Sequence, residues 1–310
     1  MIKIYMTKNG MLEALEKPQK GCWINMVHPS EKELIEIEDK YNIEPDDLRA
    51  PLDEEEASRI TKEDDYTLVL VDIPNIEEKN GKNRFSTIPL GIIIAKGAII
   101  TVCLESTPIL NFTGRAGRNI DTTLKTRMLL HILLDNAKLY LKYLRQINKE
   151  SEHLETELKR SIENPALLEM MELGRSLLYF TTSLKGNNTV LEKLSKTASV
   201  TRYEEDEDLF EDVVIETKQA SEMADTYSGI INGLMDAYSS IISNNMNVIQ
   251  KFIAIAAVVI SIPSMVFDAY GMNIDGVPFE NSPSAFIIIV IVALFASFLV
   301  YQYFKRKKMF

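Results

Sequence analysis

The sequence contains little of the chemistry that enzymes use, with only two cysteines and three histidines in 310 residues. Cys22 and Cys103 cannot form a disulfide framework, and their apolar neighbours predict that both are buried in a reducing compartment. His28, His131 and His153 lie far apart in the sequence, so core or surface positions account for them better than a metal or catalytic site. CxxC and HExxH motifs are absent, as is a nucleotide-binding glycine loop. We therefore expect no enzyme activity and no organic cofactor.

Basic residues are outnumbered as well. The chain has 34 Lys and Arg against 45 Asp and Glu, which gives a formal net charge of −11. This balance disfavours a nucleic-acid partner and is compatible with the binding of cations. The first residues, MIKIYMTKNGMLEALEK, lack the apolar core of a signal peptide.

Two long apolar runs lie near the C-terminus. Residues 251–270 and 284–304 are each long enough to cross a hydrocarbon core of roughly 30 Å as a helix. The loop between them, residues 271–283, has no Lys or Arg, whereas the tail 305–310 reads KRKKMF. Because cytoplasmic flanks carry the positive charge, we expect the tail and the large N-terminal portion to be cytoplasmic and the loop to be outside. The sequence thus predicts a multi-pass protein of the cell (inner or plasma) membrane, with lipid around its two transmembrane helices.

The first span continues a helix that begins far upstream. An acidic block at 203–212 opens this helix, and a solvated acidic N-terminus explains part of the block. No Gly or Pro interrupts the stretch between Leu234 and Ile262. We expect a stalk helix over 203–250 that runs directly into the span, so residues 204–270 would form a helix on the order of 100 Å long.

One face of this helix is small or polar throughout. Steps of four and three residues along it select Asp236, Ser240, Ser243, Asn247, Gln250, Ala254, Ala257, Ser261, Ser264, Asp268 and Gly271. We call these residues the polar stripe; their spacing is the 3.5-residue period of a supercoiled seam. Polar groups at bilayer depth are costly unless they meet each other or line water, which favours several copies around a wet axis. Ordinary helix packing is the alternative, because small residues and Ser also join membrane helices.

The first 120 residues predict a cytosolic α+β domain with a mixed or antiparallel sheet. Runs rich in Ile, Val, Leu and Tyr predict strands at 2–6, 22–27, 66–73, 86–95 and 98–104. Asn80-Gly81 and Lys96-Gly97 are typical of hairpin turns. A Ser at 30 with a Glu three residues later is a capping-box pattern, which predicts a helix over 30–41.

Residues 121–202 have the apolar spacing of a helical hairpin region. Asn164-Pro165 predicts a helix start, because Pro is favoured at the first helical position. Gly186-Asn187-Asn188 predicts a turn or kink.

The C-terminal part resembles the CorA family of divalent-cation channels. Tyr270-Gly271-Met272-Asn273 matches the family's YGMN signature, at the outer end of the first of two C-terminal spans. Residues 236–240 and 244–247 are similar to the family's pre-membrane segment, Pro263 falls at its mid-span proline, and residues 303–308 resemble its basic tail. The resemblance covers residues 203–310. It implies a funnel-shaped homopentamer in which the first span of each subunit lines a pore and the second forms an outer ring.

The resemblance also implies a function, namely Mg²⁺ influx with Co²⁺ or Ni²⁺ as further substrates. It places the selectivity filter at Gly271, Met272 and Asn273, and the polar stripe together with Ile253 along the pore. Mg²⁺ dehydrates reluctantly, so a filter of amide and carbonyl oxygens that accepts the hydrated ion avoids the cost of stripping its waters. Two acidic residues in the loop would concentrate cations at the pore mouth: Asp275 and Glu280.

The resemblance further implies regulation by intracellular Mg²⁺ at acidic subunit interfaces. Asp212 aligns with a family position that binds a regulatory ion between subunits, and Glu211 is beside it. The partner there comes from the N-terminal domain, for which Glu77 and Glu78 are the candidates in this chain.

The chain departs from the family pattern along the inner pore. Members commonly place bulky apolar rings there, whereas the positions here are Gln250, Ile253 and Ser261, of which only Ile253 is bulky and apolar. Asp268 is either a cation site in the pore or an intersubunit hydrogen-bond partner. Two other functions stay open: transport of Zn²⁺ or another divalent cation within the superfamily, and a non-conducting membrane-anchored coiled-coil scaffold or sensor. Intact Met272, with no His or Cys near the pore, favours Mg²⁺ over softer ions.

Overall fold

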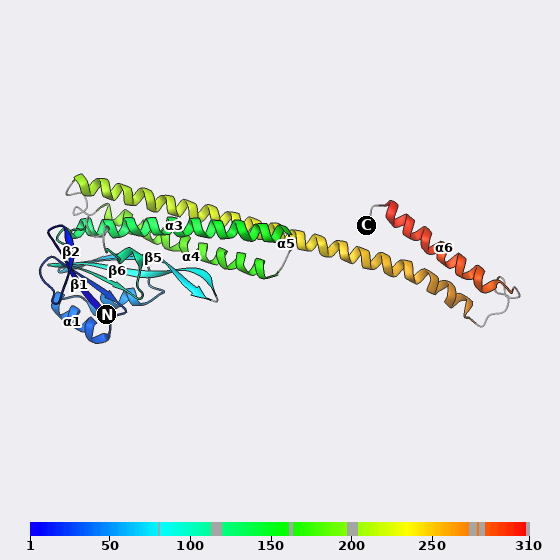
Figure 1. Ribbon diagram of the computed structural model, residues 1–310, viewed down its shortest axis with the longest axis horizontal. Helices are drawn as coiled ribbons and strands as arrows, with labels where there is room; N and C mark the ends of the chain where they lie inside the picture. Colours follow the sequence, from blue (N-terminus) through cyan, green and yellow to red (C-terminus); the bar gives the residue numbers. More distant parts are fainter. Residues whose placement is uncertain are drawn as a thin grey trace. The chain divides into compact units, whose positions relative to one another are not determined.

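A computed structural model describes residues 1–79, 81–112, 120–160, 164–196, 204–272, 278 and 283–307. Contacts divide the chain into two units, Met1–Met235 and Asp236–Phe310. The first unit holds a sheet and the helices packed on it, and the second holds two apolar helical stretches (Figure 1).

The first unit is built on one seven-stranded sheet in the order β2-β1-β3-β7-β6-β5-β4. The strands are β1 (Ile2–Lys8), β2 (Met11–Leu15), β3 (Cys22–Val27), β4 (Arg59–Lys62), β5 (Tyr66–Lys79), β6 (Lys82–Ala95) and β7 (Ala98–Cys103). β3 pairs with β7 in parallel and every other pair is antiparallel. The predicted mixed sheet is therefore confirmed, although β2 and β4 were not predicted.

Two of the connections are the predicted tight hairpins. β5 and β6 pair out to Lys79 and Lys82, and β6 and β7 pair out to Ala95 and Ala98. Gly97 has φ +98°, a backbone conformation that Gly adopts without strain. The first hairpin is longer than predicted, because β5 extends beyond residue 73 and β6 begins before residue 86.

Helices cover both faces of the sheet, which explains why its central strands read as nearly continuous apolar runs. On one face lie α1 (Glu31–Tyr41), α2 (Pro45–Arg49) and the 3-10 turn Ala50–Leu52, packed on alternate residues of β3, β5, β6 and β7 (Figure 1). The predicted capping box at the start of α1 is confirmed. The Glu33 carboxylate accepts hydrogen bonds from the backbone N–H and the hydroxyl of Ser30, at 2.8 and 3.0 Å.

On the other face lie α3 (Lys125–Arg160) and α4 (Asn164–Leu194), which contact β5 and β6 (Figure 1). The short 3-10 turn η2 (Pro108–Leu110) also packs against α3. The first part of α5 (Glu204–Tyr270) lies along α3 and α4. Its buried residues recur at helical spacing, at Val213, Thr217, Ala220, Ala224 and Ile231. The predicted helix start at Asn164 is confirmed.

A turn or kink was predicted at Gly186-Asn187-Asn188, and the turn is wrong, because α4 continues through these residues. These residues allow α4 to pack closely against the edge of the sheet. A Cβ at Gly186 would lie 3.1 Å from the hydroxyl oxygen of Ser58, just before β4. Gly therefore lets α4 approach the sheet edge, and Asn187 is buried against it with 4% of its surface exposed.

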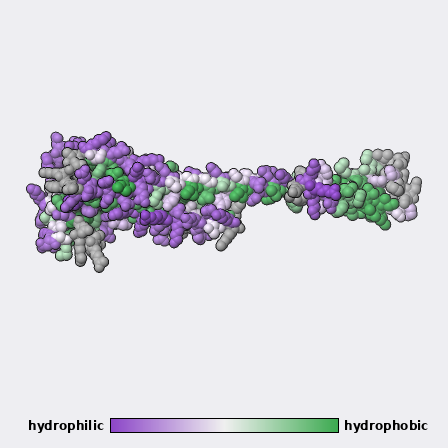
Figure 2. Space-filling view, turned by 90° about the horizontal axis from the view of Figure 1, so that it is seen from above, coloured by the Kyte–Doolittle hydropathy of each residue, from purple (hydrophilic) through white to green (hydrophobic). Residues whose placement is uncertain are grey.

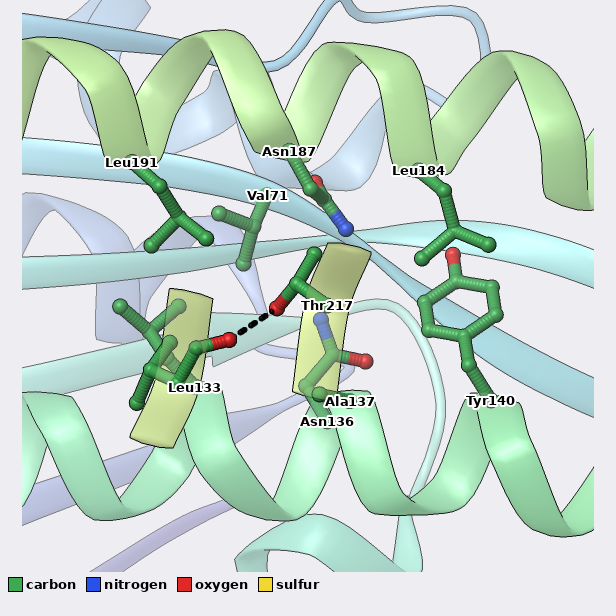
Figure 3. A pocket seen from close by; sticks show the side chains of 10 residues that line it. Val71, Leu133, Asn136, Ala137, Tyr140, Leu184, Asn187, Leu191 and Thr217 are labelled. Carbon is green, nitrogen blue, oxygen red and sulfur yellow. Dashed lines mark hydrogen bonds between the residues drawn. The ribbon is translucent and has the colours of Figure 1, made fainter. Parts of the chain in front are cut away.

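Asn187 completes the hydrogen bonding of β5 beyond the end of β4, whose last pairing is with Leu70. Its amide oxygen accepts from the backbone N–H of Asp72 at 2.9 Å, and its amide nitrogen donates to the Asp72 carbonyl at 2.8 Å. Asn136 and Tyr140 of α3 donate to the same carbonyl at 3.0 and 3.2 Å. Figure 3 shows these three side chains converging on β5 from α4 and α3. A helix side chain thus supplies what a neighbouring strand would have supplied.

The second unit contains the rest of α5 and α6 (Ala285–Arg306). Within the described ranges, these two helices are long and apolar enough to cross a membrane, judged by length and composition. Figure 2 shows hydrophobic surface gathered over their apolar stretches, whereas the surface of the first unit is mostly hydrophilic.

Candidate functional site

The face that α5 turns toward α6 is apolar. Ile255 is 4% exposed, and Val259, Ile262 and Val266 follow it as half-buried residues at helical spacing. The opposing residues of α6 are small where the helices touch most closely, with Ala293 fully buried. This is the pattern of two membrane helices that pack through small side chains.

The polar stripe lies on the opposite face of α5. At about 100° per residue, Ala257 and Ser264 are rotated by roughly 180–200° from Ile255. All eleven stripe residues are exposed in the single chain. The stripe is flanked by exposed apolar side chains, among them Ile260 at 68% and Met265 at 69%. Packing against its own α6 therefore does not explain the stripe, and the face is available to other copies or to water.

Three serine hydroxyls of the stripe donate hydrogen bonds to backbone carbonyls of α5 itself. Ser240 donates to the carbonyl of residue 236 at 3.0 Å, and Ser261 and Ser264 donate to the carbonyls of residues 258 and 260 at 2.9 and 3.4 Å. A hydroxyl that donates in this way keeps oxygen lone pairs that can accept. The water shell of a hydrated cation presents donors, so this surface has the complementary chemistry.

The predicted filter is described only in part. Gly271 closes α5, with its N–H donating to the carbonyls of Phe267 and Asp268 at 2.8 and 3.1 Å. Met272 is 56% exposed. Asn273 and both predicted mouth residues, 275 and 280, lie outside the described residues.

The predicted regulatory residues do not come together within one chain. Glu211 and Asp212 are exposed near the start of α5, and Glu77 and Glu78 are exposed near the end of the β5–β6 hairpin. Val71 of β5 lines the same cavity as residues 213 and 217 of α5. Residue 77 is six positions further along β5, which places it about 20 Å from Val71 and so away from residues 211 and 212. The described part of the chain holds no group of three or more His, Cys, Asp or Glu side chains suited to a metal ion. A site built from these residues requires two subunits.

Part of the acidic block has a structural role that the sequence did not identify. Asp206 is only 4% exposed, and its carboxylate pairs with the Arg127 guanidinium of α3 at 2.7 Å. Glu205 pairs with the same guanidinium at 2.8 Å. These ion pairs fix the start of α5 to the start of α3. The signal in the sequence was a basic residue in the first turn of α3.

The enclosed cavity between β5, α3, α4 and α5 is too small for a cofactor. Its volume is about 10 Å³, and it is lined by residues such as Leu133, Asn136 and Thr217 (Figure 3). The Asn136 amide oxygen is buried beside it with no partner among the described residues. One water molecule fits a cavity of this size.

The sequence matches a known protein family over most of its length. The sequence model described as CorA-like Mg²⁺ transporter protein matches residues 18–306. The chain belongs to the CorA family. CorA proteins are divalent-cation transporters, and the relatives of this chain are membrane proteins.

The relatives in sequence include two CorA proteins. The cobalt/magnesium transport protein CorA of Methanocaldococcus jannaschii is 28% identical over 287 residues, which cover 88% of each chain. The protein with the same description from Thermotoga maritima is 26% identical over 195 residues, covering 63% of this chain and 56% of its own length.

Solved structures show the same fold. The complete CorA magnesium transporter of Methanocaldococcus jannaschii matches with a TM-score of 0.83 at 23% identity, over 100% of this chain and 99% of the other. The full-length CmaX protein matches with a TM-score of 0.73 at 14% identity, over 98% and 96%. The long α5 and the C-terminal α6 are therefore features of a CorA fold.

Proposed function

We propose that this CorA protein is a channel for Mg²⁺ influx driven by the membrane potential, with Co²⁺ and Ni²⁺ as further substrates. The observation that carries the proposal is the exposed polar stripe on the face of α5 opposite α6. A relative is described as a cobalt/magnesium transport protein, which agrees with this choice of ions.

In the proposed assembly, five copies of α5 surround a wet axis with their stripes inward, and the α6 helices form an outer ring against lipid. The potential alone drives influx, because moving a 2+ ion across 100 mV releases about 4.6 kcal/mol, at roughly 2.3 kcal/mol per charge. Gly271, Met272 and Asn273 form the filter, and Asp275 and Glu280 concentrate cations at its mouth. The stripe hydroxyls accept hydrogen bonds from the water shell of the ion.

The proposed regulation follows from linkage between Mg²⁺ binding and subunit contacts. Mg²⁺ bridging Asp212 and Glu211 to Glu77 or Glu78 of a neighbouring subunit favours the closed assembly, and its loss releases the stalks. Asp212→Ala should therefore weaken inhibition by internal Mg²⁺, whereas Asp208→Ala, also at an exposed acid of the first turns of α5, should not. Unchanged inhibition in the Asp212 variant removes this residue from the site.

Uptake in proteoliposomes tests the function itself. The wild type should take up Mg²⁺ when the interior is negative, and Asn273→Ala should abolish uptake. Asn148→Ala is the matched control, because this residue lies on α3 in the first unit and its side-chain amide donates a hydrogen bond to Glu152 of the same helix, at 2.7 Å. Wild-type liposomes that admit Zn²⁺ but not Mg²⁺ favour the zinc alternative, and liposomes that admit neither ion favour the scaffold.

A further inference from the structure

Pro263 interrupts the hydrogen-bond ladder of α5 in the middle of its apolar stretch. Proline has no N–H, so the carbonyl four residues earlier, that of Val259, cannot receive its usual helical hydrogen bond. An unpaired carbonyl at membrane depth is costly, because hydrocarbon offers no hydrogen-bond donor. The break therefore needs a donor from elsewhere.

The donor comes from α6. The Ser297 hydroxyl donates to the Val259 carbonyl oxygen at 3.1 Å. Ser297 is 7% exposed, and Ala293, one turn away on the same face, is fully buried. The small side chain at 293 lets the helix backbones approach closely enough for a serine, the shortest hydroxyl side chain, to reach across.

The carbonyls on either side of Val259 also accept serine hydroxyls. Ser261 donates to the Val258 carbonyl at 2.9 Å, and Ser264 to the Ile260 carbonyl at 3.4 Å. Three successive carbonyls before Pro263 thus each accept a hydrogen bond from a serine hydroxyl. Two of these serines belong to the polar stripe and one lies on α6. Serine hydroxyls therefore occupy the carbonyls around the position where proline removes the backbone donor.

We propose that Ser297 is a positioning residue for the ion path. Its hydroxyl replaces, at Val259, the hydrogen bond that Pro263 cannot donate, and so holds this part of α5, with the polar stripe that it carries, against α6. The link to ion passage rests on the proposed function, whereas the replacement of the hydrogen bond does not.

A double-mutant cycle tests the replacement. Ser297→Ala should lower the midpoint of thermal unfolding of the purified protein by about 2–4 °C, the shift expected for one net hydrogen bond. In the Pro263→Ala background the restored N–H pairs with the Val259 carbonyl, so the same serine substitution should have almost no effect. Equal falls in the two backgrounds overturn the proposal.

A second cycle with Val266→Ala is the matched control. Val266 is on the same face of α5, about 10 Å from Val259 along the helix, so the effects of Val266→Ala and Ser297→Ala should add. If Ser297→Ala couples to Val266→Ala as strongly as to Pro263→Ala, the cycles report general packing between the helices and not the hydrogen bond to the Val259 carbonyl. That result would also overturn the proposal.

Mg²⁺ uptake tests the link to the ion path. Ser297→Ala should change the uptake rate, and the change should disappear when Pro263→Ala is present. An unchanged rate despite coupling in stability refutes the role in ion passage and leaves the hydrogen-bond replacement standing. Absence of uptake in the wild type refutes the proposed function instead, and the stability cycle still decides the replacement.

Discussion

Asn187→Ala should destabilise the first unit strongly, because one buried side chain serves a backbone position that no strand reaches. The substitution removes the two hydrogen bonds to Asp72, at 2.9 and 2.8 Å, and one from the Ser58 hydroxyl at 3.2 Å. The Asp72 carbonyl keeps its other donors, Asn136 and Tyr140, but the Asp72 N–H loses its partner. An orphaned buried donor costs about 1–3 kcal/mol, and the other lost bonds raise the expected total to about 2–4 kcal/mol.

The neighbouring asparagine provides the control. Asn188 is half-buried on the same turn of α4, and its replacement by Ala should be neutral or slightly stabilising, because Ala has the higher helix propensity. For a unit of this size each kcal/mol shifts the unfolding midpoint by about 2–4 °C, so Asn187→Ala should lower it by roughly 5–15 °C. The assay is thermal unfolding of both variants followed by circular dichroism. Similar midpoints for the two variants would refute the assigned role of Asn187.

Two further predictions concern titrating groups of the first unit. Cys22 and Cys103 are fully buried, and burial raises the pKa of the Cys103 thiol to about 11, so neither should react with a thiol reagent at about pH 8 until the protein is unfolded; rapid labelling of the native protein would contradict this. Burial also raises the pKa of the Asp72 carboxyl, so the folded state holds this proton more tightly than the unfolded state, and stability falls as the pH rises above the ordinary value. The difference in unfolding midpoint between Asp72→Asn and the wild type should therefore shift in favour of the variant when the pH is raised from about 4 to about 8. A difference that does not change with pH would argue against this contribution.

The two strands that sequence patterns missed are the two edges of the sheet, β2 and β4. Edge strands bury little of their surface and tolerate charge, so MLEAL and RITK carry no alternating apolar signal. The central strands, covered by helices on both faces, were readable for the opposite reason. The distal part of the β5–β6 hairpin was missed because polar, exposed residues such as Glu77, Glu78, Asn83 and Arg84 interrupt its apolar pattern.

The polar stripe was predictable because a helix converts a 3.5-residue period directly into one face. The contacts that fix the long helices were not. The Asn187–Asp72 and Ser297–Val259 hydrogen bonds each join a side chain to a backbone group distant in the sequence, and no local pattern records such a pairing. In isolation Gly186-Asn187-Asn188 has the composition of a turn, and only the adjoining sheet edge explains why the helix continues.

Aqueous labelling of single cysteines in α5 tests the central claim that the polar stripe faces water in the assembled protein. The substitutions are Ala257→Cys and Ser264→Cys on the stripe, with Ile260→Cys and Met265→Cys as controls on the flanking apolar surface, which is 68–69% exposed in the single chain. In membranes, a charged, membrane-impermeant thiol reagent should modify the two stripe positions and leave the two flanking positions unmodified. Modification of the flanking positions with protection of the stripe would contradict the account.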